Sequence, residues 1–225
     1  MKKFSLLIAI SFSILFLVTN VFAATSNKNN SITINQKKIL ANAPDLNANA
    51  LNYAIKAYHY AVKKADIKRP DILTIVNFNM PAYEKRMWVI NLKTSKILMK
   101  AYTTQGKNSG LVYARHFSNN FHTDESSLGV YKITNTYYGE HGLSERLQGL
   151  EKGVNNNAFR RDIVIHPAWY ATPGFVKKFH RTGRSWGCFA INPAISKKFI
   201  NLTKGGSVLF AYAKPEQHDK IILSA

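Results

Sequence analysis

The sequence predicts a mainly β fold with a few peripheral α-helices. Runs rich in β-branched and aromatic residues recur from residue 71 onward, and two of them are joined by a short polar turn. Helical periodicity is confined to segments before, between and after these runs. We expect a single domain over residues 45–225, because about 180 residues bury a sizeable core without a second domain.

The first 23 residues match a secretory signal peptide. Two lysines precede an apolar run from Phe4 to Val18, and the small Ala23 suits a cleavage site. The run is shorter than the roughly 18 apolar residues of a membrane-spanning helix, so an uncleaved anchor is the weaker alternative. We therefore expect export to the periplasm or cell envelope, with no transmembrane segment after cleavage.

The next segment, residues 24–44, is rich in Asn, Ser and Lys and predicts a flexible lead-in. A helix is expected from Asp45 onward, with Asp45 or Asn47 as its N-cap, because apolar side chains recur there at spacings of three and four. These side chains are Leu51, Ile55, Tyr58 and Val62.

Five strands are predicted in the middle of the chain, at residues 71–79, 86–92, 96–104, 128–138 and 161–166. The second and third form a hairpin through the turn at 93–95. Residues 139–160 are polar, with four glycines and three consecutive asparagines, and predict a long functional loop.

The C-terminal part is predicted to hold two helices and a last strand. The first helix spans residues 173–180, and the second follows a cap at Asn192 and runs to about Lys204. The strand spans residues 207–213.

The chain is strongly basic. Its formal net charge is +19 at pH 7, and +17 once Lys2 and Lys3 leave with the signal peptide. Such a charge favours polyanionic surroundings, for example cell-envelope polymers with carboxylate or phosphate groups. Nucleic acid is the alternative partner, but export and the lack of a basic helix or stacking motif disfavour it.

Cys188 is the only cysteine of the chain and lies in "RTGRSWGCFAINP", residues 181–193. Exported proteins that use cysteine structurally use pairs, so Cys188 is a buried filler, an intermolecular cross-link or a nucleophile. The surroundings favour the nucleophile. Arg184 and the following helix would lower the thiol pKa, and Gly187 would let the amides of residues 187 and 188 face one oxyanion. The structural alternative is a tight turn with Trp186 packed beneath it.

A nucleophilic thiol needs a base. His166 is the best candidate, because it ends the apolar strand "IVIH" and is followed by Pro167. His141, in the polar stretch 139–160, is the second candidate. The alternative is that His166 is a satisfied histidine at a strand end. The sequence shows no zinc-ligand spacing and no GxSxG turn, so we expect neither a metal, a cofactor nor a serine nucleophile.

Taken together, these segments resemble the murein L,D-transpeptidases with a YkuD-type catalytic domain, in the branch whose cysteine motif reads GRSWGC. The matching stretches occur in order between residues 84 and 193: "EKRMWVINL", "GKNSG", "SSLGVY", "YYGEHGLSERLQGLEKGVNNNA", "RRDIVIH" and "GRSWGCFAINP". The resemblance implies a β-sandwich-like L,D-transpeptidase-type catalytic domain that acts on peptidoglycan stem peptides.

The resemblance also implies roles for individual residues. Cys188 would be the nucleophile and His166 the general base, with the main-chain carbonyl of Pro167 orienting the imidazole. Ser185, Gly187 and the amide of Cys188 would border the oxyanion site.

Two departures from more familiar members concern the donor peptide. Those members read S-H-G-C with an arginine soon after the cysteine, whereas here Trp186 replaces the histidine and no arginine follows Cys188. Recognition of the donor's terminal carboxylate would then fall to Arg184, Arg181 or Arg160.

The implied reaction is a two-step acyl transfer through a thioester on Cys188. A neighbouring stem as acceptor gives a 3→3 cross-link, a lysine of an envelope protein gives an anchor, and water gives L,D-carboxypeptidase activity. The order of histidine, cysteine and arginine along the chain disfavours papain-like and NlpC-like peptidases and sortases. The rival from another class is a non-catalytic, cationic cell-wall-binding protein that retains the fold.

Overall fold

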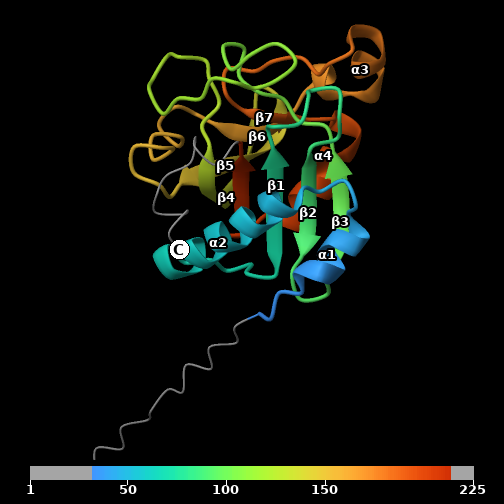
Figure 1. Cartoon of the computed structure of the whole chain (residues 1–225). Helices are drawn as coiled ribbons and strands as arrows, with labels where there is room; N and C mark the ends of the chain where they lie inside the picture. The colour runs from blue at the N-terminus through green and yellow to red at the C-terminus, as the bar shows by residue number, and fades with distance from the viewer. Residues whose placement is uncertain (1–31, 214–225) are drawn as a thin grey trace, which may run out of the picture. The chain divides into compact units, whose positions relative to one another are not determined.

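The computed structural model describes residues 32–213 (Figure 1). Within them, strands form one sheet in the order β3-β2-β1-β8-β4-β5-β6-β7. Their bounds are β1 Ile72–Asn77, β2 Met87–Asn91, β3 Lys96–Ala101, β4 Gly129–Gly139, β5 Gly142–Gly149, β6 Val164–Pro167, β7 Phe189–Ile191 and β8 Val208–Tyr212. The mainly β prediction with peripheral helices is confirmed. The expected signal peptide lies outside the described residues, and no helix within 32–213 is long and apolar enough to cross a membrane.

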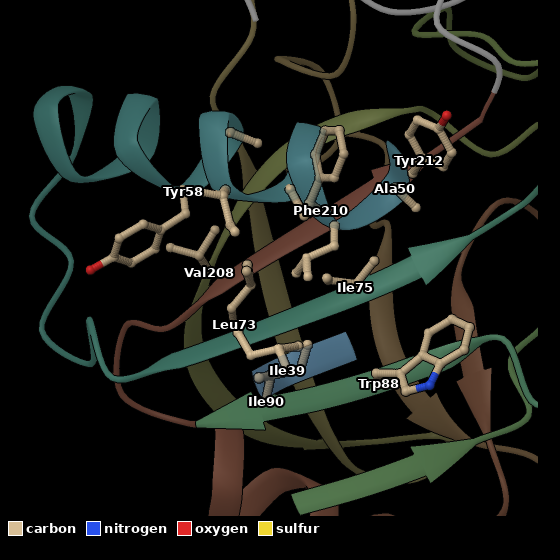
Figure 2. Close-up of a cluster of buried hydrophobic side chains, with 14 of the residues drawn as sticks. Ile39, Ala50, Tyr58, Leu73, Ile75, Trp88, Ile90, Val208, Phe210 and Tyr212 are labelled. Atoms are coloured by element: carbon tan, nitrogen blue, oxygen red, sulfur yellow. The ribbon is translucent and has the colours of Figure 1, made fainter. Parts of the chain in front are cut away.

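Helix α2 (Ala48–Lys64) covers one face of the sheet, as the spacing of its apolar residues predicts. The side chain of Asn47 caps it by accepting hydrogen bonds from the amides of Asn49 and Ala50. Beneath it lies the first core cluster, drawn in Figure 2, which joins α2 to strands β1, β2 and β8. Its members include Ala50, Tyr58, Leu73, Ile75, Trp88, Ile90, Val208 and Phe210.

Helix α1 (Gln36–Asn42) corrects the later part of the flexible lead-in predicted over residues 24–44, whereas residues 24–31 lie outside the described residues. Ile39 is fully buried in the first core cluster, and the side-chain amide of Asn42 donates to the carbonyl oxygen of Ser95 at 2.9 Å. A seven-residue helix is too short to show periodicity among polar residues, so its docking depends on these few contacts.

A second core cluster fills the opposite face of the sheet. Alternation along β1 sends Ile72 and Val76 to this face and Leu73 to the first. Helix α4 (Pro193–Thr203) packs on it through Phe199. The predicted hairpin of β2 and β3 is confirmed, and β1 also pairs in parallel with β8.

Strand β5 corrects the prediction of a long loop over residues 139–160. It pairs antiparallel with β4 through a two-residue turn at positions 140 and 141, and antiparallel with β6 on its other side. Gly142 closes the turn with φ at +87°, a left-handed value that suits glycine. The strand was hidden in the sequence because Ser144 and Glu145 are buried polar residues, which remove the apolar alternation.

The segment between β6 and β7 positions the candidate site. The short 3-10 helix η1 (Trp169–Ala171) and helix α3 (Pro173–Phe179) connect these two parallel strands. Helices α3 and α4 lie where the sequence predicted them, and Asn192 caps α4 by accepting from the amide of Ala194. Strand β7 was not predicted, because its three residues are too few to form a pattern.

Candidate active site

Strands β6 and β7 bring the backbone segments that carry His166 and Cys188 side by side. His166 pairs with Ala190 in the parallel ladder, and Cys188 immediately precedes β7. Paired residues in a parallel ladder share a face, so His166 and Ala190 point to the same side of the sheet. The two predicted catalytic residues therefore come from adjacent segments, with Cys188 two residues before the ladder partner of His166.

The imidazole of His166 is held in one tautomer. Its Nδ1 lies 3.1 Å from the carbonyl oxygen of Pro167, which can only accept, so Nδ1 carries the proton and Nε2 is left to act as a base. His141 stacks on the ring with centroids 4.4 Å apart. Burial lowers the pKa of His166 to about 4. The hydrogen bond to Pro167 raises this pKa in part, and the nearby His141 lowers it further. The base is therefore neutral at pH 7.

The thiol of Cys188 is also neutral at pH 7. Desolvation by the surrounding protein raises its pKa to about 11, although the residue is partly exposed. A hydrogen bond from the amide of Val164 and the charge of Arg161 lower the pKa in part, whereas Asp162 raises it. The Sγ atom donates to the carbonyl oxygen of Asp162 at 3.4 Å. Both side chains are therefore uncharged at pH 7.

The prediction of a lowered thiol pKa is therefore wrong, for two structural reasons. Arg184 is exposed and directs its guanidinium to the carbonyl oxygen of Lys107 at 2.8 Å. Strand β7 separates Cys188 from the start of α4, so the helix N-terminus lies beyond the strand. Arg161, which the sequence reading did not single out, supplies the positive charge instead.

Ser185 closes the turn that carries Cys188. Its Oγ donates to the carbonyl oxygen of Cys188 at 2.7 Å and accepts from the amide of Gly187 at 3.2 Å. Gly187 has φ at +121°, and a Cβ there would lie 2.7 Å from Ile163 Cδ1. Because the Gly187 amide is engaged within the turn, the predicted pair of oxyanion donors is reduced to the amide of Cys188.

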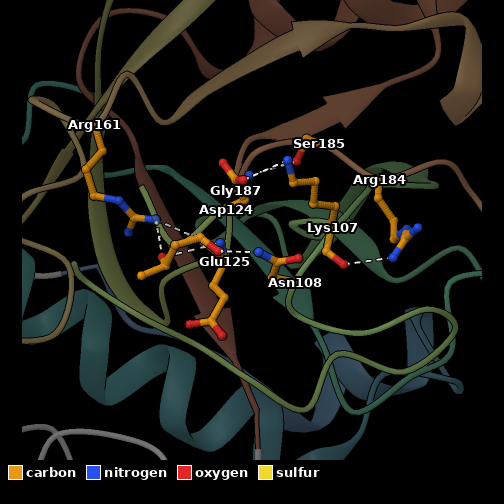
Figure 3. Close-up of polar contacts among 9 residues, drawn as sticks. Lys107, Asn108, Asp124, Glu125, Arg161, Arg184, Ser185 and Gly187 are labelled. Carbon is orange, nitrogen blue, oxygen red and sulfur yellow. Dashed lines mark hydrogen bonds and ion pairs between the residues drawn. The ribbon is translucent and has the colours of Figure 1, made fainter. Parts of the chain in front are cut away.

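The loop around residue 107 fastens the cysteine turn from the other side (Figure 3). The amide of Lys107 donates to the carbonyl oxygen of Ser185 at 2.7 Å, and the amide of Ser185 donates to that of Gln105 at 3.0 Å. Trp186 is 75% exposed, with the Lys107 ammonium 5.8 Å from its ring centroid. Trp186 therefore faces outward, contrary to the alternative of a tight turn packed over its ring.

Arg161 ties a third loop to the site. Its guanidinium donates to the carbonyl oxygens of Ser118 and Glu125 and to the hydroxyls of Thr123 and Ser127, at 2.6–3.4 Å. The only signal in the sequence was the charged run "RRD" directly before the apolar strand. Residues 32–213 contain no group of three or more His, Cys, Asp or Glu residues that could hold a metal ion.

A family model described as an L,D-transpeptidase catalytic domain matches residues 42–212. The chain belongs to the L,D-transpeptidase catalytic domain family. The match covers every strand of the sheet, together with His166 and Cys188.

Several solved L,D-transpeptidases are similar in structure at low identity. One from Mycobacterium smegmatis is 13% identical with a TM-score of 0.39, over 64% of this chain and 59% of that one. One from Stackebrandtia nassauensis is 13% identical with a TM-score of 0.39, over 80% and 77%. One from Xylanimonas cellulosilytica is 9% identical with a TM-score of 0.37, over 63% and 60%. The chain thus spans about three fifths of the Mycobacterium smegmatis protein. No curated protein matches it.

Proposed function

We propose that this L,D-transpeptidase-family chain is an exported cysteine acyltransferase of peptidoglycan stem peptides, with Cys188 as nucleophile and His166 as general base. The observation that supports this most strongly is the pairing of β6 with β7, which brings Cys188, the residue directly before β7, beside the strand that carries His166. The bond from His166 Nδ1 to Pro167 leaves Nε2 free of a proton, which is the state that a base requires.

In the first step, the sulfur of Cys188 attacks the carbonyl carbon of the third stem residue while its proton passes to Nε2 of His166. The amide of Cys188 stabilises the oxyanion that forms. The tetrahedral intermediate then breaks its carbon–nitrogen bond, and His166 returns the proton to the leaving amine. D-alanine departs, and the acyl group remains on Cys188 as a thioester.

In the second step, an acceptor attacks the thioester and His166 takes the acceptor's proton. An amine of a neighbouring stem forms a 3→3 cross-link, and a lysine of an envelope protein forms an anchor. Water gives the carboxypeptidase product. The carbon–sulfur bond breaks, and the thiolate regains its proton from His166.

The neutral resting pair sets the kind of catalysis. A thiol with a pKa of about 11 and an imidazole with a pKa of about 4 do not form an ion pair at pH 7. We therefore propose general-base catalysis, in which the proton moves as the substrate is attacked. The basic composition, with a net charge of +19, supports attraction to an anionic wall polymer.

The test is incubation of the mature protein with muropeptides that bear tetrapeptide stems, with products followed by mass spectrometry. We expect loss of D-alanine, and the ratio of dimers to tripeptides separates cross-linking from hydrolysis. A folded Cys188→Ala protein is the control and is expected to be inactive. Tight binding to peptidoglycan by both proteins, without turnover by either, would instead support a non-catalytic wall-binding protein.

A further inference from the structure

A pocket of about 240 Å³ opens beside the cysteine turn. It is lined by aromatic rings and charged groups, namely Phe121, His122, Asp124, residues 160–162 and Trp186. It adjoins the nucleophile, because the backbone carbonyl of Asp162 accepts the hydrogen bond from Cys188 Sγ and Trp186 lies two residues before Cys188. A ligand in this pocket would therefore lie next to the reacting sulfur.

The two acids of the pocket are paired with cations outside its lining. The carboxylate of Asp124 lies 2.8 Å from the ammonium of Lys107, and that of Asp162 lies 3.1 Å from the guanidinium of Arg146. The negative charges of the lining acids are thus neutralised by cations outside the pocket. The two arginines of the lining have no such counter-ion in the described structure.

The guanidinium of Arg161 donates only to uncharged carbonyl and hydroxyl oxygens in these hydrogen bonds, so its positive charge is not neutralised by them. Arg160 is exposed and stacks its guanidinium over the ring of Phe121, 5.2 Å from the centroid. Within residues 32–213, the structure shows no hydrogen bond or ion pair for the Arg160 side chain. Stacking on an aromatic face leaves the N–H edges of a guanidinium free for a planar oxyanion.

The backbone of the lining is also unusual. His122, Asp124 and Asp162 have φ values of +61°, +55° and +52°, in the left-handed region that residues other than glycine seldom adopt. Such conformations concentrate at ligand-binding sites, where the surrounding structure holds them in place. Here the bonds of Arg161 to the loop of residues 118–127 hold two of the three (Figure 3).

We propose that this pocket binds a carboxylate of the donor stem peptide and that Arg160 recognises it through its free N–H edges, a proposal that rests on the proposed function for its substrate. The aromatic rings of Phe121 and Trp186 border the same space and suit the apolar atoms next to that carboxylate. The probe is therefore a tetrapeptide stem with free carboxylates at its terminal D-alanine, its third residue and its second residue. All three present the same chemistry, and amidation of one at a time distinguishes them.

The experiment measures binding of a free tetrapeptide stem to the folded Cys188→Ala protein by titration calorimetry. Adding Arg160→Gln is expected to weaken binding about 10- to 100-fold, the range for loss of a charge-assisted hydrogen bond. Arg160→Lys keeps the charge without the planar fork and is expected to lose less. Lys198→Gln removes one exposed charge from α4, away from the pocket, and is the matched control with binding within about twofold.

Three peptides, each with one carboxylate converted to an amide, identify the group that Arg160 contacts. One of the amidated peptides is expected to bind the Cys188→Ala parent protein as weakly as the unmodified peptide binds the Arg160→Gln variant of that parent. The affinity of this amidated peptide should not fall further when Arg160 is replaced as well. Equal binding by parent and Arg160→Gln, or no binding by the parent at millimolar peptide, would overturn the proposal. Because the parent lacks the thiol, a failure of acyl transfer in the wild type is a separate result.

Discussion

The core under α2 and the surroundings of Cys188 are built by different means. Under α2, apolar side chains at regular spacings pack against β1, β2 and β8. Around Cys188, hydrogen bonds join segments far apart in sequence, such as Ser126 Oγ to the carbonyl of Gly187, 61 residues away. The stability of the core under α2 therefore depends on the apolar volume that it buries. The geometry around Cys188 depends instead on individual hydrogen-bond donors and acceptors, so the loss of one such atom is expected to change it.

The largest expected effect is a loss of activity, without loss of stability, from a substitution near Cys188. His166→Gln removes the proposed general base and is expected to lower kcat about 10²- to 10⁴-fold, because proton transfer must then go to water. The free energy of unfolding should stay within about 1 kcal/mol, since the residue is not part of either main core cluster. Kinetics with a tetrapeptide substrate and urea denaturation measure the two quantities. Unchanged kcat in the variant would contradict the role of His166.

In the core under α2, a substitution should lower stability strongly and activity little. Leu73 is fully buried there (Figure 2), and Leu73→Ala is expected to cost about 2–5 kcal/mol of stability through lost burial and a cavity. Activity per folded molecule should remain within about twofold at a temperature below unfolding. Urea denaturation gives the first quantity, and activity normalised to the folded fraction gives the second. A drop in normalised activity to the level of His166→Gln would show that the two regions are coupled.

Gly187→Ala tests whether backbone geometry positions the nucleophile. At φ +121°, a Cβ would meet Ile163 Cδ1 at 2.7 Å and the carbonyl oxygen of Glu125 at 2.8 Å. We expect a loss of about 1–3 kcal/mol in stability and about 100-fold in kcat/KM. Gly174→Ala in α3 is the control, because a Cβ there meets nothing within 4 Å. Its activity should be unchanged and its stability equal or higher by up to about 1 kcal/mol, and equal behaviour of the two variants would refute the role of Gly187.

The pH dependence of thiol alkylation tests the neutral resting pair. Because burial raises the pKa of Cys188 to about 11, the rate with iodoacetamide should rise about tenfold per pH unit from about 7 to 10. The chain unfolded in guanidinium serves as the control, and its rate should level off above about pH 9. A fast rate that is constant between about pH 5 and 8 would indicate a thiolate–imidazolium pair instead.

The last prediction concerns Glu145, a buried carboxyl between β5 and α4, and bears on stability alone. Desolvation raises its pKa to about 8, although Thr203 Oγ, 2.9 Å from Oε2, and Lys204 lower it in part. The folded state therefore holds this proton more tightly than the unfolded chain, whose pKa is 4.5. Its contribution is full below pH 4.5 and is lost as the pH rises toward 8. Urea denaturation across this range should show less pH dependence for Glu145→Gln than for the wild type, and identical slopes would contradict the assignment.

Much of the fold could be predicted because its core elements repeat apolar residues. Helix α2, strand β1, the β2–β3 hairpin and helix α4 all lie where periodicity and capping placed them. Four elements were not predicted: α1, η1 and β7 are too short to show a period, and β5 buries polar residues. Their docking depends on partners that come from other parts of the chain, which a local pattern does not contain.

In the candidate site, too, some residues could be predicted from the sequence and others could not. Cys188 and His166 could be proposed from the sequence because few residue types can serve as nucleophile and base, and the structure places them on segments that lie side by side. Arg161 and Asp162 were not assigned a role, although both act on the thiol pKa. Asp162 meets Cys188 across 26 residues and Arg161 meets Ser118 across 43. Such contacts appear only once the loops are folded, and so does the burial of the thiol, which is the main reason that its pKa is raised and not lowered.

The central claim is that Cys188 carries the acyl group. The most direct measurement is to mix the mature protein with tetrapeptide substrate, quench within the first turnovers and locate the adduct by peptide mapping with mass spectrometry. The account predicts an adduct with the mass of the donor less D-alanine, on the peptide that contains Cys188, and none in Cys188→Ala. Release of D-alanine with the adduct on another residue, or its release by Cys188→Ala, would contradict it.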